Sequence, residues 1–242
     1  MAKKVNKTDE QFANVEENLS KAGLYVEKNL LKIGIVTAII LIIIISFIYI
    51  KNNKAESLNK LQQDASSEMY IAEFYFQNND YDKALNGDSI LSIDNIGDTM
   101  ISFHKGFINI SKEYSSTNVG NIANYYAAIC QINLGEYKNS LNSLNNFETD
   151  DEIISSLSTG LKGDAYMELG DTTKAMSFYK SAATDNVNSF TTPYFMMKQS
   201  KILELNKDFA SALEIYNTIK SDYPESKEGI NIDKYITSAS NR

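Results

Sequence analysis

The sequence predicts an all-α protein in which a single N-terminal transmembrane helix precedes a solenoid of about four helical hairpins. Three observations support this fold class. Prolines number only two, while residues that favour helices are abundant. One long run near the N-terminus is apolar and uncharged. Small residues recur at regular intervals through the rest of the chain, which is typical of stacked helical repeats.

The apolar run covers residues 33–50 and is bounded by Lys32 and Lys51. As a helix it would extend roughly 27 Å, close to the hydrocarbon thickness of a bilayer. A cleaved signal peptide is disfavoured because 32 residues precede the run and no Ala-x-Ala site follows it. The sequence therefore predicts an uncleaved single-pass anchor between a tail at residues 1–32 and a helical linker at 51–65. Lysines flank the anchor almost equally, so charge gives only a weak preference for a cytoplasmic N-terminus.

The tail contains a predicted amphipathic helix. Thr8 and Gln11 form a capping-box pattern at its start. Apolar residues then recur at steps of three and four, as expected for one helix face: Phe12, Val15, Leu19, Ala22 and Val26. Two interpretations stay open, namely a helix that docks on the membrane surface or on itself, and a helix that binds a partner protein.

Four copies of a helical hairpin are predicted within residues 66–242. In each copy a small residue opens the second helix, and another small residue lies twelve positions earlier. These pairs are Ala72 with Ala84, Ala128 with Ser140, Gly163 with Ala175, and Ser200 with Ala212. Bulky residues follow in the second helix, among them Tyr179 and Tyr216. Small residues allow antiparallel helices to approach closely and bulky residues fill the space between hairpins, so the pattern predicts stacked helix pairs.

The first copy is about twenty residues longer than the others, because 56 residues separate Ala84 from Ser140. Asn86 and Gly87 form a strong turn signal that should end the second helix early. Residues 86–106 are therefore predicted to be an inserted loop, of a length that is more often functional or mobile than inert.

A second recurring pattern marks the ends of two helices. Tyr114 precedes Gly120 by six residues, and Tyr223 precedes Gly229 by the same interval. The match predicts that one helix ends and the next begins in the same way at both places. It also predicts a C-terminal capping helix over residues 229–239.

The hairpins resemble the tetratricopeptide repeat, a unit of 34 residues with small residues at two fixed positions and an aromatic residue after the second. The copy "GDAYMELGDTTKAMSFYKSAA" carries the resemblance best, and Pro224 matches the proline that ends a repeat, but the tryptophan of the family pattern is missing. The resemblance implies that the first helix of each pair lines a concave groove that binds peptides or proteins. The groove residues implied here are Tyr125, Tyr126, Ile129, Leu161, Met167, Tyr194, Met197, Lys198 and Lys201. Each of them is as well suited to packing between helices.

Composition argues against nucleic-acid binding and catalysis. The net charge is −8, and Arg242 is the one arginine of the chain, whereas nucleic-acid binders usually carry a basic face. With one histidine, His104, and one cysteine, Cys130, the sequence offers no Cys/His nucleophile pair and no zinc site. A buried structural thiol is the favoured interpretation of Cys130. We therefore expect no enzyme activity, no cofactor and no metal.

The order of the parts, with "LNGD", "GNIANYYAAICQINLGEY", "GDAYMELGD" and "YPESKEG", resembles the YfgM-type membrane-anchored tetratricopeptide repeat proteins. The resemblance implies a bacterial inner-membrane protein with a cytoplasmic N-terminus and a periplasmic C-terminal domain. It implies an ancillary subunit of the SecYEG translocon that works beside a periplasmic prolyl-isomerase-type chaperone, with client polypeptides as possible further partners. Two alternatives stay open. One is a scaffold for envelope assembly or cell division with one dedicated partner, and the other is an enzyme or ligand sensor that uses the 86–106 loop.

Overall fold

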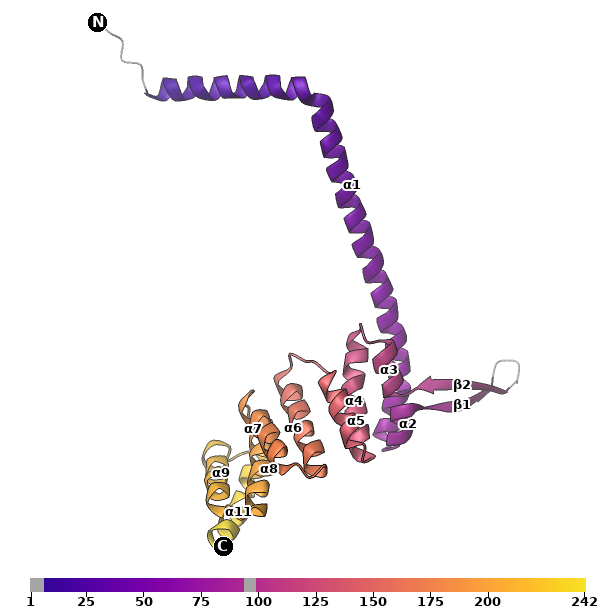
Figure 1. The fold of residues 1–242 in the computed structure, drawn as a ribbon, viewed down its shortest axis with the longest axis vertical. Coiled ribbons are helices and arrows are strands. Elements are labelled where there is room, and N and C mark those ends of the chain that lie inside the picture. The colour runs from indigo at the N-terminus through magenta and orange to yellow at the C-terminus, as the bar shows by residue number, and fades with distance from the viewer. Residues whose placement is uncertain (1–6, 94–98) are drawn as a thin grey trace. The chain divides into compact units, whose positions relative to one another are not determined.

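A computed structural model provides the structure of the chain, and it is mostly helical (Figure 1). It describes the backbone of residues 7–93 and 99–242. Side chains are described for residues 15–242 except 22, 25, 26, 33, 34, 36–38 and 90–102. The chain divides into two compact units, residues 1–57 and 58–242.

The described part of the first unit is helical throughout and belongs to α1 (Lys7–Gln77). The sequence predicted a short amphipathic helix, an anchor helix and a helical linker, and the described residues of all three segments lie within one uninterrupted helix. Of the predicted amphipathic face, Val15 and Leu19 are exposed, and the other side chains lie outside the description. Within the described residues, no helix combines the length and the apolar character needed to cross a membrane. The predicted anchor at 33–50 includes side chains outside the description and stays a prediction.

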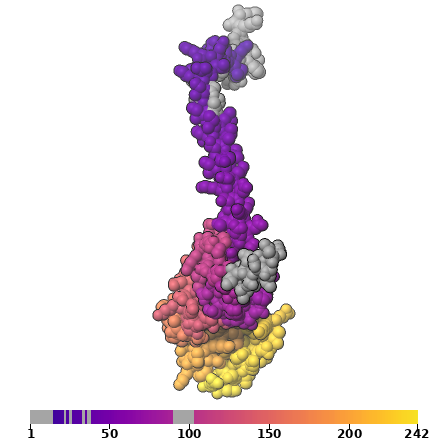
Figure 2. All heavy atoms as spheres, turned by 90° about the vertical axis from the view of Figure 1, so that its right-hand side faces the viewer, coloured from indigo at the N-terminus to yellow at the C-terminus, as the bar shows by residue number. Residues whose placement is uncertain are grey.

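The second unit contains the helical repeats and one β-ribbon. Its elements after α1 are α2 (Tyr81–Asn86), β1 (Gly87–Ile93), β2 (Thr99–Lys105), α3 (Phe107–Glu113), α4 (Asn118–Asn133), α5 (Tyr137–Asn145), α6 (Glu152–Glu168), α7 (Thr172–Thr184), α8 (Thr191–Leu205), α9 (Phe209–Asp222), α10 (Lys227–Ile230) and α11 (Ile232–Ser240). Successive helices pack on one another, as α4 with α5, α6 with α7, and α8 with α9. In the space-filling view the colours follow chain order through the packed body, as expected for a stacked array (Figure 2). The prediction of tetratricopeptide-like helical repeats is confirmed.

The same turn joins the two helices in every copy. The residue before the cap has a left-handed backbone: Asn79, Gly135, Gly170 and Lys207 have φ values of 60°, 79°, 79° and 62°. In each case its N–H donates to the carbonyl three residues back, and the next N–H donates to the carbonyl five back. This is the hydrogen-bond pattern that satisfies the free carbonyls at a helix C-terminus. An aspartate follows in three copies and caps the second helix: Asp80, Asp171 and Asp208.

The small residues lie where helices cross, as the repeat pattern predicted. Ala128, Ala175 and Ala212 are fully buried. Gly163 of α6 faces the ring of Tyr179 of α7, and a Cβ atom at Gly163 would stand 2.5 Å from that ring. A side chain at this position would therefore force the two helices apart.

The two Tyr–Gly patterns form matching junctions. After α3, Thr117 caps the next helix by accepting from the N–H of Gly120, and its hydroxyl donates to the carbonyl of Tyr114 at 2.7 Å. After α9, Ser226 makes the same two bonds, to Gly229 and to Tyr223. A Cβ atom on either glycine would come within about 2 Å of the tyrosine carbonyl, which explains the glycines.

The C-terminal residues cover the last pair of helices. Ile232 and Ala239 of α11 are buried in one core cluster with Tyr216 and Ile219 of α9. The short helix α10 begins at Lys227 and α11 at Ile232, so the predicted capping helix at 229–239 is divided at Asn231. A terminal helix of this kind closes the apolar end of a solenoid.

The predicted loop at 86–106 is an antiparallel β-ribbon, and the expectation of an all-α fold is wrong in this segment. Helix α2 ends at Asn86, and β1 pairs with β2 from Gly87 opposite Lys105 to Ile93 opposite Thr99. The ribbon interrupts the second helix of the first pair, which continues as α3. It extends away from the helices of the second unit (Figure 1).

Helix side chains hold the base of the ribbon. The hydroxyl of Tyr75 donates to Asp88 at 3.0 Å, and Lys83 pairs with the same carboxylate at 3.1 Å. On the second strand, Lys105 pairs with Glu113 at 2.9 Å and with Glu68 at 3.6 Å. These contacts join the base of the ribbon to α1, α2 and α3.

Candidate peptide-binding groove

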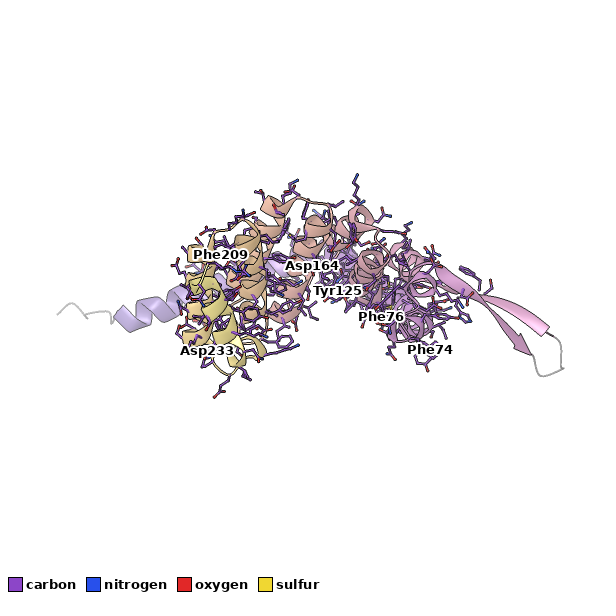
Figure 3. All side chains as sticks on the ribbon, turned by 90° about the horizontal axis from the view of Figure 1, so that it is seen from below. Phe74, Phe76, Tyr125, Asp164, Phe209 and Asp233 are labelled. Atoms are coloured by element: carbon purple, nitrogen blue, oxygen red, sulfur yellow. The ribbon has the colours of Figure 1, made fainter. Side chains whose placement is uncertain are left out.

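A groove lies along the first helices of the later repeats. It encloses about 420 Å³, and its walls come mainly from α6 and α8, with one residue each from α4 and α7. The lining residues are Ile132, Asp164, Met167, Glu168, Tyr179, Lys198, Lys201, Ile202 and Leu205. Figure 3 shows Phe76, Tyr125 and Asp164 following one another along the curved array of helices. The residues that line the groove thus include apolar side chains, acidic side chains and basic side chains.

Two lining residues of this groove form an ion pair. Asp164 of α6 and Lys198 of α8 form a salt bridge across the two helices, and about a quarter of each side chain is exposed. The carboxylate also accepts the hydroxyl hydrogen of Tyr179 at 2.6 Å. Because both partners are fixed on helices of different repeats, the pair ties one repeat to the next.

Aromatic rings surround the Lys198 ammonium group. It lies 5.3 Å from the ring centre of Tyr179 and 5.2 Å from that of Tyr194, within the range of cation–π attraction. Burial, and then the hydrogen bond to Asp164, raise the pKa of Tyr179 above its ordinary value. The tyrosine is therefore protonated throughout the physiological pH range and acts as a donor to the carboxylate.

Four of the residues expected in the groove are brought together here. Met167, Lys198 and Lys201 line it, and Tyr194 contacts Lys198. Lys201 is exposed, whereas Lys198 is largely covered by its neighbours. Lys201 can therefore meet a ligand directly, while Lys198 is already paired.

The other expected residues are placed differently. The ring of Tyr125 packs on Phe147, and that of Tyr126 stacks on Phe107, each with ring centres 5.1 Å apart. Met197 is buried in the cluster around α9 and α11. Ile129 and Leu161 are half-buried and lie outside the lining of this groove. Packing between helices accounts for Tyr125, Tyr126 and Met197.

Sequence reasoning missed Asp164 and Tyr179 as groove residues. A signal existed for the first, since Asp164 and Lys198 carry opposite charges, lie 34 residues apart and fall on the first helices of adjacent repeats, within three positions of equivalence. Opposite charges at nearby places on neighbouring first helices favour an ion pair between them. For Tyr179 the signal was hidden, because its spacing equally fits a purely packing residue.

The arrangement suits binding better than catalysis. The apolar side chains of Met167 and Leu205 offer contact area, and Lys201 and Glu168 offer one exposed charge of each sign. Thioether and aliphatic groups adapt to varied polypeptide side chains. Among the described residues, no group of His, Cys, Asp or Glu side chains is placed to hold a metal ion.

Comparison with known families gives one match. Residues 194–226 match the family described as Tetratricopeptide repeat, and this segment covers most of α8 and all of α9. A comparison with curated proteins gave no match. The chain thus contains a tetratricopeptide repeat, and the helix pairs before it share its turn and its small residues. Such repeats serve as modules that bind protein partners.

Proposed function

We propose that this protein is a non-enzymatic adaptor that is tethered to the bacterial inner membrane by residues 33–50 and binds polypeptides in the groove of α6 and α8. Its N-terminus would lie in the cytoplasm and its repeats in the periplasm. There it would act as an ancillary subunit of the SecYEG translocon and link the translocon to a prolyl-isomerase-type chaperone or to emerging chains.

The groove is the observation that carries the binding proposal. It presents Lys201 and Glu168 beside a floor of apolar side chains, and the Asp164–Lys198 pair holds its two walls together. A polypeptide with an acidic and an apolar side chain in succession would complement this surface. The tether would raise the local concentration of the groove near chains that emerge at the membrane.

The membrane part of the proposal depends on the sequence. The run at 33–50 has eighteen uncharged residues, and residues 51–242 carry 17 basic and 26 acidic side chains. A domain of net charge −9 would be repelled by anionic headgroups and would remain available to protein partners. The link to the translocon depends on the resemblance to YfgM-type proteins.

Site-specific photocrosslinking in cells tests the partner. A photoreactive amino acid replaces Lys201 in the groove, and a matched variant carries it at Asn217, an exposed position on α9. We expect crosslinks from position 201, and not from 217, to a SecYEG subunit, a prolyl-isomerase-type chaperone or a secreted client. A single envelope-assembly or division protein at position 201 would instead favour a scaffold, and equal products at both positions would contradict a binding role for the groove.

Cysteine labelling tests the topology. In a Cys130→Ser background, Ser89→Cys places a thiol at an exposed position on β1 and Leu19→Cys places one at an exposed position in the tail. A membrane-impermeant maleimide should label the first in intact spheroplasts and the second only after lysis. Labelling in the reverse order would place the repeats in the cytoplasm and exclude the translocon role proposed here.

A further inference from the structure

A second and larger groove lies on the other helices of the array. It encloses about 620 Å³ between α3 and α5, with α4 at its floor. Six of its eleven lining residues carry carboxamide groups: Asn121, Asn124, Gln131, Asn139, Asn142 and Asn146. The described lining contains no acidic and no aromatic side chain, and Lys112 provides its one charge. This groove shares no lining residue with the groove of α6 and α8.

One of these asparagines already binds the main chain of a segment outside the helices. The amide of Asn121 donates to the carbonyl of Glu148 at 2.7 Å, and its oxygen accepts the N–H of Glu148 at 3.0 Å. Glu148 lies in the segment between α5 and α6, which is neither helix nor strand. A carboxamide has a donor and an acceptor side by side, so it can satisfy both polar groups of one peptide unit. The groove therefore contains an internal example of asparagine binding to main chain.

Other asparagines of the groove leave all or part of their hydrogen-bonding capacity unused. Among the described residues, the side chains of Asn142 and Asn146 make no hydrogen bond to protein, and Asn139 uses only its amide group, toward Glu136. Asn139 and Asn142 lie on α5 and Asn146 is the C-cap residue that follows it. At three and four positions apart, they share one face and follow one another about every turn, or roughly 5.4 Å. An extended chain repeats its outward polar groups every two residues, roughly 6.6 Å, which is close to this spacing.

We propose that the groove of α3, α4 and α5 binds an extended, uncharged polypeptide segment through its backbone. Asn139, Asn142 and Asn146 would pair with alternate peptide units, much as Asn121 pairs with Glu148. The three span roughly 10 Å along the helix axis, and three alternate peptide units of an extended chain span roughly 13 Å, so the outer two side chains would splay apart by about 3 Å to reach them. Because the contacts go to main-chain atoms, the sequence of the bound segment would matter little.

The chemistry of the lining favours a polypeptide over other polar ligands. Phosphates of a nucleic acid would need several cations, and this groove has one. A sugar ring would be expected to stack on an aromatic face, which the described lining lacks. Backbone amides need paired donors and acceptors, which is what the carboxamides provide.

Binding of a designed peptide to the full-length protein in detergent tests this proposal. The probe is a fluorescein-labelled, end-capped peptide of alternating serine and valine, and its partner probe carries N-methyl groups on alternate backbone nitrogens. We expect binding by anisotropy for the first probe, and a loss of tenfold or more in affinity for the second, because methylation removes the backbone donors.

Substitutions in the protein then show which groove binds the peptide. Asn139→Ala with Asn142→Ala changes two exposed side chains and should lower affinity tenfold or more, whereas Asn217→Ala on α9 and Lys201→Ala in the other groove should leave affinity unchanged. In parallel, the side-chain amide signals of ¹⁵N-labelled asparagines should shift on addition of the peptide and not of maltotriose. Unchanged binding of the methylated probe or of the double variant, shifts caused by the sugar, or no binding of the first probe would each overturn the proposal. Loss of binding in Lys201→Ala alone would assign the peptide to the other groove and overturn it as well.

Discussion

Asp164 and Lys198 are 34 residues apart in the chain and form a salt bridge between the first helices of adjacent repeats. The hydroxyl of Tyr179 also donates to the carboxylate, so one aspartate connects α6, α7 and α8. About three quarters of each charged side chain is shielded from water. The attraction within this pair is therefore less screened than that of a surface ion pair.

A double-mutant cycle should show that the Asp164–Lys198 pair stabilises the protein more than an exposed ion pair does. For Asp164→Asn and Lys198→Met we expect a coupling of about 1–2 kcal/mol in the free energy of unfolding, from urea titrations followed by circular dichroism. The exposed pair of Lys220 and Asp233, 2.7 Å apart, is the control and should give less than about 1 kcal/mol. Equal coupling for the two pairs would contradict a special role for the groove pair.

From the turn between paired helices we predict a substitution that stabilises the folded protein. Lys207 has φ of 62°, whereas glycine occupies the same place in two other copies, at Gly135 and Gly170. In this left-handed conformation a residue with a Cβ atom is destabilised by roughly 1 kcal/mol or more. We expect Lys207→Gly to raise the free energy of unfolding by up to about 1 kcal/mol, and Gly170→Ala to lower it by a similar amount. A Lys207→Gly protein that melts below the wild type would contradict this account.

From the close contact between α6 and α7 we predict a substitution that destabilises the protein. Alanine at Gly163 would place Cβ 2.5 Å from the ring of Tyr179, which is too close for any normal contact. We expect Gly163→Ala to lower the free energy of unfolding by about 1–3 kcal/mol despite the better helix propensity of alanine. The control Ser177→Ala lies on an exposed face of α7 and should have little effect.

The origin of the effect can be tested by suppression. In a Tyr179→Leu background the ring is gone, so Gly163→Ala should cost clearly less than it does in the wild type. If the cost stays the same in both backgrounds, the steric explanation fails. Thermal melts of the four proteins give the comparison.

From the geometry at the base of the ribbon we predict that the helical repeats fold without the ribbon. Gly87 and Gly106 stand back to back, since a Cβ atom at Gly106 would be 2.4 Å from the nitrogen of Gly87. The chain therefore leaves and re-enters the helical array at one point. We expect deletion of residues 88–105, which joins the two glycines, to leave the helical circular dichroism intact and to change the melting temperature by only a few degrees. Loss of cooperative unfolding would mean that the ribbon is part of the core.

Local patterns predicted the helix pairs, and long-range contacts decided what the sequence did not predict. Small residues and the Asn86–Gly87 turn act within a few positions, and they were found from the sequence. The ribbon depends on contacts such as that of Lys105 with Glu68, 37 residues away, and its short strands alternate only weakly. The packing of Tyr125 on the ring of Phe147 was not predicted for a related reason. Helical spacing identifies a face of a helix but does not tell which neighbour will cover it.

The single cysteine predicts how the folded protein responds to thiol reagents. Cys130 lies in α4 and has no exposed surface, and burial raises the pKa of its thiol to about 12. Only the thiolate reacts, and at pH 8 a group of this pKa is ionised in about one molecule in ten thousand. We expect Ellman's reagent at pH 8 to leave the folded protein almost unmodified and to react with one thiol per chain in guanidinium chloride. Because the raised pKa belongs to the folded state, reaction at pH 8 should follow unfolding, and its onset across a denaturant series should coincide with the loss of helical circular dichroism. Rapid labelling before that loss would show that α4 opens locally, and it would contradict the protection expected from the burial of Cys130 in one core cluster with Ala127 and Phe107.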